Sequence, residues 1–180
     1  MGQKYVMGID IGSSNIKTII FSLGGDVVSS HSEEVVEIYP SDGQIEQNPL
    51  EIWSQLCKSV KITVEESGID PQYIAGIGID SNRCGLLLLD KDCQPLTNIM
   101  TWRDTRSKSF VQSFTKENQD IDLYKITGEE GRPQHTLFKA LWCQNEIPSV
   151  WKKSKYIFLS PKDYILYKLL GKRISSKSMA

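Results

Sequence analysis

Between Asp10 and Lys17 the chain carries a run of residues that could bind phosphate groups. The run reads Asp-Ile-Gly-Ser-Ser-Asn-Ile-Lys, and it joins two stretches of β-forming residues, 5–11 and 16–21. A strand followed by a turn of small residues places backbone N–H groups and the hydroxyls of Ser13 and Ser14 at one edge of a sheet. Phosphate oxygens can accept hydrogen bonds from all of these groups, so the turn is a candidate phosphate-binding loop.

The two charged residues of this run suit a bound nucleotide. Asp10 cannot bind phosphate directly, but a carboxylate can hold a hydrated Mg²⁺ ion that bridges phosphates. Lys17 could add a positive charge beside the polyphosphate. An ordinary β-hairpin with a glycine turn fits the spacing equally well. Two other phosphate loops do not fit, because the G-x-x-x-x-G-K-[ST] pattern is absent and residues 15–20 are strand-like, whereas a dinucleotide fingerprint opens a helix.

The elements around this turn predict an α/β domain. Paired glycines within 23–26 favour a second tight turn, so residues 5–11, 16–21 and 27–36 form an antiparallel three-strand meander. Asn48 and Pro49 are typical of a helix start, and a helix is expected from there to about residue 67. Further expected elements are strands at 74–79 and 86–89 with both faces covered, a strand end at 97–102, and helices at 136–145 and 161–171.

Composition restricts the kind of protein. The chain has 180 residues and a formal net charge of -1, which is typical of one soluble globular domain. The apolar start is too short for a secretory signal or a membrane span, which favours the cytoplasm. Lysines and arginines near the end alternate with apolar residues, so we expect no nucleic-acid partner and no membrane partner. The four cysteines lack zinc-ligand spacing and are expected to be reduced and mostly buried.

Four segments resemble one family, the FGGY carbohydrate kinases. The stretch GIDIGSSNIKTIIF is similar to the first phosphate motif of the ribonuclease H-like, actin-like ATP-binding superfamily. Residues 74–107, with their W-x-D-x-R element, the sequence QNPLEIW, and residues 150–172 resemble later elements of the carbohydrate kinases in the same order. The resemblance implies a ribonuclease H-like α/β domain, with a mixed sheet opened by the meander and flanked by helices.

The resemblance also implies roles for particular residues. Asp10 would act in catalysis and in holding magnesium, and ATP and Mg²⁺ would be the cofactors. Cys84 stands where the family has a stronger hydrogen-bonding residue such as His or Glu, which leaves the substrate open among sugars, polyols and sugar acids. The implied phosphate-binding residues are Gly12, Ser13, Ser14, Asn15 and Lys17, and the implied substrate-binding residues are Arg83, Cys84, Trp102, Asp104, Arg106 and Gln134.

The resemblance further implies that residues 1–180 are the N-terminal domain of a two-domain kinase. We then expect the C-terminal domain, the general base and the adenine pocket to lie beyond residue 180, and the isolated chain to be inactive. The protein's own C-terminal domain would be a partner, and a homodimer is left open. Two alternatives remain at this point: a non-catalytic sugar sensor of the same fold, and an ATPase activator of a radical dehydratase.

Overall fold

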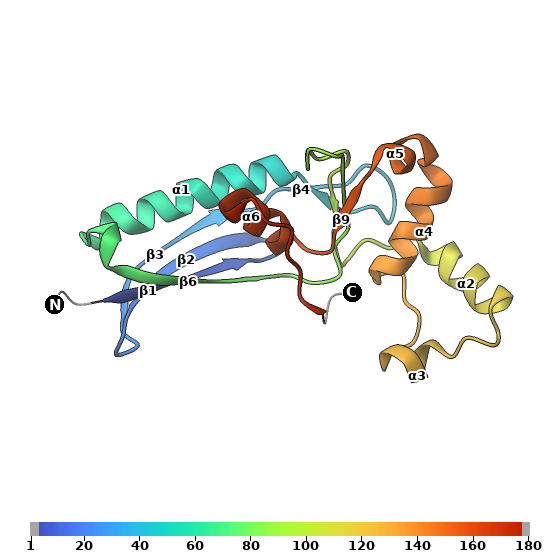
Figure 1. The fold of residues 1–180 in the computed structure, drawn as a ribbon, viewed down its shortest axis with the longest axis horizontal. Helices are drawn as coiled ribbons and strands as arrows, with labels where there is room; N and C mark the ends of the chain where they lie inside the picture. Colours follow the sequence, from blue (N-terminus) through green and yellow to red (C-terminus); the bar gives the residue numbers. More distant parts are fainter. Residues whose placement is uncertain (1–3, 178–180) are drawn as a thin grey trace.

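The computed structural model describes residues 4–177, and its largest feature is a four-stranded mixed sheet (Figure 1). β1 (Tyr5–Ile11), β2 (Asn15–Ser22) and β3 (Val27–Glu34) are antiparallel neighbours, and β6 (Ile74–Ser81) runs parallel to β1. The order β3-β2-β1-β6 confirms the predicted meander and mixed sheet. The third strand ends at Glu34 instead of Val36, because the next N–H, that of Val35, bonds to the β1–β2 turn.

The long helix α1 (Pro49–Ser67) begins and ends where its capping residues predict. The Asn48 side chain accepts hydrogen bonds from the N–H groups of Leu50 and Glu51, and Pro49 occupies the first turn. Gly68 ends the helix with a φ of 64°, a left-handed conformation that glycine adopts at little cost. The sequence signals therefore fix this helix at both ends.

α1 covers one face of the sheet and leaves the other face for a site (Figure 1). Ile52 and Leu56 pack in one core with the inward-facing residues of β1 and β2. Buried and more exposed residues alternate along both strands, so Ile9 is buried under the helix while Asp10 is exposed on the opposite face. The same alternation exposes Lys17 on β2. The chemically active residues of the first two strands thus lie on the face away from α1.

Two small sheets continue the core beyond the end of β6. β7 (Leu87–Leu89) pairs with β9 (Tyr156–Phe158), and β5 (Glu46–Gln47) lies between β4 (Glu37–Ile38) and β8 (Ile99–Met100). The predicted strand at 97–102 is thus only partly present, because after β8 the chain enters turns. The prediction that the apolar run of 86–89 is covered on both faces is confirmed, since these leucines are at most 1% exposed.

The remaining helices occupy two places. α2 (Lys108–Glu117), α3 (Leu123–Thr127), α4 (Thr136–Glu146) and α5 (Pro148–Lys153) gather at the end of the molecule away from the four-stranded sheet (Figure 1). α6 (Pro161–Leu170) contacts α1 and β6. The predicted helices at 136–145 and 161–171 are confirmed with small changes in their ends. A short 3-10 helix, η1 (Pro71–Tyr73), leads into β6.

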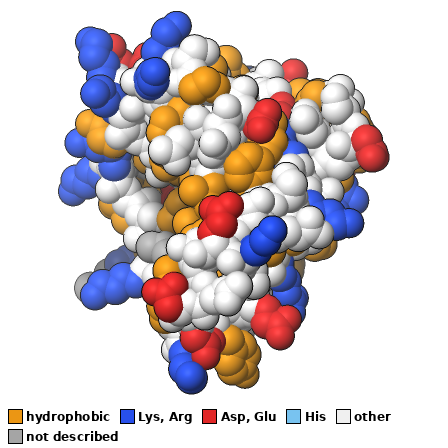
Figure 2. All heavy atoms as spheres, turned by 90° about the vertical axis from the view of Figure 1, so that its right-hand side faces the viewer, with side chains coloured by type: hydrophobic (Ala, Val, Ile, Leu, Met, Phe, Trp, Pro, Cys, Tyr) orange, Lys and Arg blue, Asp and Glu red, His pale blue; other side chains and the backbone are white. Residues whose placement is uncertain are grey.

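Among the exposed apolar side chains of the described residues, two groups are notable for their place in the fold. One is the α2–α5 end, where apolar side chains reach the surface between charged ones (Figure 2), and α3 contributes Tyr124 and Ile126. The other is β6, where the prediction of coverage on both faces was wrong: Ile77 is 54% exposed. Ile77 is in register with the buried Met7 and so lies on the same face of the sheet as α1, but α1 packs over β2 and β3 and leaves this edge strand largely uncovered. No helix within residues 4–177 combines the length and the apolar character that crossing a bilayer requires.

Candidate functional site

The β1–β2 turn is tight and is held from outside by the rest of the domain. The N–H of Gly12 donates to the carbonyl oxygen of Asn15 at 2.9 Å, and a Cβ added to Gly12 would lie 2.9 Å from that same oxygen. Only glycine fits there without moving the turn. The Ser13 carbonyl oxygen accepts a hydrogen bond from Gln47 at 3.0 Å, and the Ser14 carbonyl oxygen accepts one from the chain after β3 at 2.8 Å. The domain therefore fixes the loop in one shape.

Three charged residues form a row across the sheet beside this turn. Asp10 is in register with Lys17 on β2 and with Asp80 on β6, and all three are exposed. They line one open hollow of about 450 Å³ together with Gly8 and Gly78, where the lack of side chains leaves room. The predicted acid thus faces solvent-filled space beside the loop, as a phosphate site requires.

Asp80 is a site residue that the sequence analysis missed. It lies beside Asp10 because parallel strands β1 and β6 end at the same edge of the sheet. An acidic residue in the last positions of a second strand was the available signal. Two neighbouring carboxylates with serine hydroxyls close by form a set of hard oxygen donors, which is the chemistry that Mg²⁺ selects. The residues present therefore fit the magnesium ion that the resemblance implies.

A second hollow, of about 260 Å³, opens where β6 ends. Arg83 and Cys84 line it from one side, and residues of α3 and the start of α4 line it from the other. Cys84 has a φ of 57°, a left-handed backbone conformation that residues other than glycine rarely adopt. His135 in the same wall lies 3.0 Å from a carboxylate oxygen of Glu129. The hollow therefore offers both polar and apolar groups to a small ligand.

Trp102 connects the segment after β8 to the β1–β2 turn. Its indole N–H donates to the hydroxyl of Ser13 at 2.9 Å, although the two residues are 89 positions apart in the chain. Its side chain remains 45% exposed, so one surface of the ring is available to a ligand. An indole face suits the apolar face of a sugar. The structure thus brings the predicted substrate element against the predicted phosphate loop.

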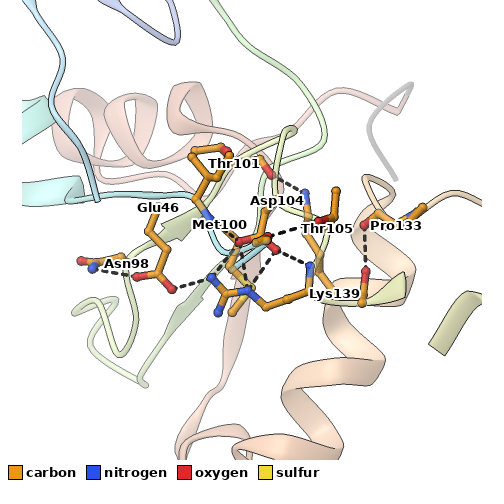
Figure 3. Close-up of polar contacts among 12 residues, drawn as sticks. Glu46, Asn98, Met100, Thr101, Asp104, Thr105, Pro133 and Lys139 are labelled. Atoms are coloured by element: carbon orange, nitrogen blue, oxygen red, sulfur yellow. Dashed lines mark hydrogen bonds and ion pairs between the residues drawn. The ribbon is translucent and has the colours of Figure 1, made fainter. Parts of the chain in front are cut away.

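Asp104 and Arg106 lie beneath this surface and not on it. Asp104 is drawn among its polar contacts in Figure 3. Asp104 is fully buried and accepts hydrogen bonds from the N–H of Ile45 at 2.8 Å and from the Arg106 guanidinium at 2.8 to 3.0 Å. Arg106 also donates to Glu46 at 2.6 Å and stacks over Trp142 at 4.8 Å. Burial lowers the pKa of Arg106, but its bonds to the two carboxylates outweigh that effect and the pKa is raised overall.

This buried network changes the interpretation of two predicted contacts. Direct sugar binding by Asp104 and Arg106 stays a prediction, yet the geometry gives these side chains a different task. They tie the loop after β8 to the β5 segment. Gln134 is half-buried at the start of α4. Its carbonyl oxygen accepts a hydrogen bond at 2.9 Å from Lys139, a second residue that the sequence analysis missed. A lysine beside Phe138 on the buried side of a helix was the available signal.

The meander, the parallel strand β6 and the acid beside a serine-containing turn together define a class of protein, the ribonuclease H-like, actin-like ATPase domains. Solved structures agree with this fold. The gluconate kinase from Lactobacillus acidophilus superimposes with a TM-score of 0.91 at 29% identity, covering 99% of this chain and 35% of that one. The ligand-bound xylulose kinase from the same organism gives 0.90 at 29% identity, covering 98% and 35%.

Sequence comparison then gives the family. Residues 5–180 match the N-terminal domain of the FGGY family of carbohydrate kinases, and the chain belongs to that family. The xylulose kinase of Bacillus subtilis (strain 168) is 35% identical over 171 residues, which are 94% of this chain and 34% of that protein. The gluconokinase of Bacillus licheniformis is 32% identical over 178 residues, 98% of this chain and 34% of that protein.

Two consequences follow from these comparisons. The chain spans about a third of the length of the curated relatives it matches. Membership in a carbohydrate kinase family also favours a phosphotransferase over the radical-dehydratase activator, since the match extends over the W-x-D-x-R segment as well as the phosphate loop.

Proposed function

We propose that the full-length protein transfers the γ-phosphoryl group of ATP to a hydroxyl of a sugar, polyol or sugar acid, and that this chain supplies the phosphate loop and one wall of the sugar site. The observation that carries the proposal is the 2.9 Å hydrogen bond from Trp102 to Ser13. It fixes the distance between a sugar-binding surface and a phosphate-binding loop, and phosphoryl transfer depends mainly on such positioning.

The reaction moves one phosphoryl group. The substrate hydroxyl oxygen forms a bond to the γ-phosphorus, the bond from that phosphorus to the β,γ-bridging oxygen breaks, and ADP leaves. The hydroxyl proton passes to a general base, which the resemblance places outside this chain. Within the chain, the Ser13 and Ser14 region holds phosphate oxygens, and Lys17 offsets their negative charge. We assign Gly12 and Asn15 to the shape of that turn.

Magnesium has a place in this scheme. Asp10, with Asp80 beside it, would hold the ion, which supplies charge neutralisation to the phosphates when bound. Both carboxylates face the hollow near the phosphate loop. Their proximity also keeps two negative charges together at the sheet edge, which favours a cation between them. Asp10 is the better placed of the two, because it lies two residues before Gly12 at the start of the phosphate loop.

The sugar wall consists of Trp102, Arg83 and Cys84, with Gln134 at its border. Arg83 is exposed beside the second hollow, where a guanidinium can bind hydroxyls or a carboxylate. Cys84 offers only a weak hydrogen-bonding group, so the wall suits a ligand that meets an apolar contact there. This combination supports a polyhydroxylated substrate, neutral or acidic.

The compartment and partners follow from the reaction. We place the protein in the cytoplasm, where both ATP and small sugars are available. We place its C-terminal domain across the hollow from the phosphate loop. A homodimer would show as a doubled mass in light scattering of the full-length protein. Neither nucleic acid nor membrane has a role in the proposed reaction.

A substrate panel tests the proposal directly. The full-length protein is incubated with MgATP and pentuloses, hexoses, polyols or aldonates, and ADP release is measured. We expect one structural class to be phosphorylated far above the ATP-only background. Sugar binding with no ADP release across the whole panel would instead identify a non-catalytic sugar sensor of the same fold.

A further inference from the structure

Lys139 on α4 is fully buried, although it carries an ammonium group. Its Nζ donates hydrogen bonds to the carbonyl oxygens of Cys84 at 2.5 Å, Thr101 at 2.6 Å and Gln134 at 2.9 Å. An ammonium has three N–H donors, so each donor has one main-chain acceptor. All three N–H donors of the side chain are therefore used inside the protein, and none is left to bind a ligand directly.

The three acceptors belong to the three segments that carry the predicted sugar contacts. Cys84 and its neighbour Arg83 follow β6, Thr101 directly precedes Trp102 after β8, and Gln134 precedes α4. These carbonyls lie 55, 38 and 5 positions from Lys139 in the chain. Figure 3 shows Lys139 and Thr101 within one continuous group of polar contacts with Asp104 and Glu46. One side chain thus joins every segment of the sugar wall.

The charged residues around Lys139 show why a lysine is needed at this position. Asp104 and Glu46 carry negative charges and Arg106 a positive one, so with Lys139 the buried group of four is neutral when all are ionised. Even so, burial lowers the pKa of Lys139 to about 8, which means that the ammonium pays a desolvation cost. An apolar side chain would avoid that cost, but it would remove this donor from the carbonyl oxygens of Cys84 and Gln134 and leave that of Thr101 with only the N–H of Asp104. The lysine therefore fixes positions that packing alone would not.

Backbone strain at Cys84 is a second reason why this segment must be held in place by other contacts. Its left-handed φ of 57° is unfavourable for a residue with a side chain, so the surrounding contacts must hold it. The Lys139 ammonium bonds to the Cys84 carbonyl, and the next N–H, that of Gly85, bonds to Leu159 at 2.9 Å. Together these bonds hold the Cys84–Gly85 peptide at both its carbonyl and its N–H group, next to the hollow that Arg83 and Cys84 line.

We propose that Lys139 is the positioning residue of the sugar site: by binding the carbonyl oxygens of Cys84, Thr101 and Gln134, it sets the relative places of Arg83, Cys84, Trp102 and Gln134 against the sugar. This inference rests on the proposed kinase function and deepens it. Lys139 acts through the segments it joins and does not touch the substrate. The phosphate loop lies outside this group of bonds, so binding of ATP is expected to depend on Lys139 far less than binding of the sugar.

Kinetics of the full-length protein test the proposal first. We expect Lys139→Met to raise the KM for the sugar by about tenfold or more while the KM for ATP stays within about twofold. The matched control is Leu56→Ala on α1, which also destabilises a buried site but lies away from the sugar wall. It should lower the melting temperature and leave both KM values within about twofold. Equal changes in the two KM values of Lys139→Met, or an unchanged sugar KM, would overturn the proposal.

Hydrogen–deuterium exchange of the full-length protein tests the positioning without any turnover. In Lys139→Met, peptides covering 82–86, 99–105 and 131–136 should all exchange faster by about tenfold or more, while those covering β1–β3 should match the wild type. Leu56→Ala should show the reverse pattern. If the three segments keep wild-type exchange, Lys139 does not position them, even if the protein proves to be a kinase. If the wild type phosphorylates no sugar, the proposed function fails while this measurement still decides the role of Lys139.

Discussion

At the scale of single residues, the proposed chemistry depends most on the side chain of Asp10. It is exposed in a hollow beside the phosphate loop and lies between a lysine and a second acid. We expect Asp10→Ala in the full-length protein to lower kcat by about a hundredfold or more, because the group that would hold magnesium is removed. The KM for the sugar should change little. Steady-state ADP release at saturating sugar measures both constants.

A matched acid distinguishes this role from a general effect of charge. Asp120, in the loop between α2 and α3, is also exposed but lies far from the sheet edge in the fold. Asp120→Ala should leave kcat within about twofold of the wild type. An Asp10→Ala variant that kept its kcat would exclude a metal role for that residue.

Gly12 carries a second prediction at this scale. A methyl group there would lie 2.9 Å from the Asn15 carbonyl oxygen, closer than side chains normally approach, so the turn must shift. We expect Gly12→Ala to raise the KM for ATP by about tenfold and to destabilise the fold by about 1–3 kcal/mol. Gly76→Ala on β6 is the control, because no atom lies within 4 Å of its added Cβ. The idea fails if the two alanine variants have the same KM for ATP.

At the scale of elements, the link between the first strand pair and the loop after β8 is the 2.9 Å hydrogen bond from Trp102 to Ser13. If this bond sets the distance between the sugar wall and the phosphate loop, the two side chains should couple energetically. In a double-mutant cycle of Trp102→Phe and Ser13→Ala, we expect a coupling of about 0.5–1.5 kcal/mol in kcat/KM for the sugar.

Ser14 provides the control for this cycle. It occupies the next position of the same turn, but its hydroxyl makes no bond to the indole among the described contacts. The cycle of Trp102→Phe with Ser14→Ala should therefore show a coupling near zero. Strictly additive effects in both cycles would mean that the hydrogen bond from Trp102 does not set the relative position of the two elements.

The sequence predicts elements well where local signals are strong. Asn48 and Gly68 bound α1, and period-2 alternation identifies β1 and β2 and the face on which Asp10 lies. β5 and β8 are too short for any period to show, and they exist because they pair with each other across more than fifty residues. The short helix α3 likewise lacks a long apolar stripe and was not predicted.

Long-range contacts also explain which features of the site could not be predicted from the sequence. The loop residues 10–17 are contiguous, so their chemistry was readable from the sequence. The burial of Arg106 depends on Glu46, 60 positions away, and the role of Lys139 depends on carbonyl oxygens, which every residue has. No residue pattern records which carbonyl a buried lysine will reach. For the same reason the sequence did not reveal that the side chains of Asp104 and Arg106 face the interior; their direct contact with the sugar stays a prediction.

At the scale of the whole molecule, the proposed function makes this chain one half of a transfer site. It holds the predicted phosphate loop and sugar wall, it spans about a third of its curated relatives, and most of the edge strand β6 is exposed within the described residues. We expect the 180-residue chain alone to release no ADP above background with any sugar that the full-length protein uses. Turnover by the isolated chain at a typical enzymatic rate would contradict this division.

The stability of the whole molecule should depend on pH through Lys139. Its pKa is lowered to about 8 from 10.5, chiefly by burial; electrostatic interactions with Asp104 and Cys84 oppose this, and that with Arg106 adds to it. Below pH 8 the folded and unfolded chains both carry the proton, so the full cost of burying the ammonium is present. Between pH 8 and 10.5 the unfolded chain binds more protons, so the free energy of unfolding rises with pH by at most about 1.4 kcal/mol per unit.

Variants isolate this contribution from all other titrations. Lys139→Met has no proton to lose at that position, so the melting temperature of the wild-type full-length protein minus that of Lys139→Met should increase as the pH is raised from 8 to 10. Leu56→Ala keeps the lysine, and its difference from the wild type should stay constant over the same range. A Lys139→Met difference that is also constant would mean that the buried lysine keeps an ordinary pKa, and that the bonds to its three carbonyls and the nearby carboxylates fully offset the loss of solvent.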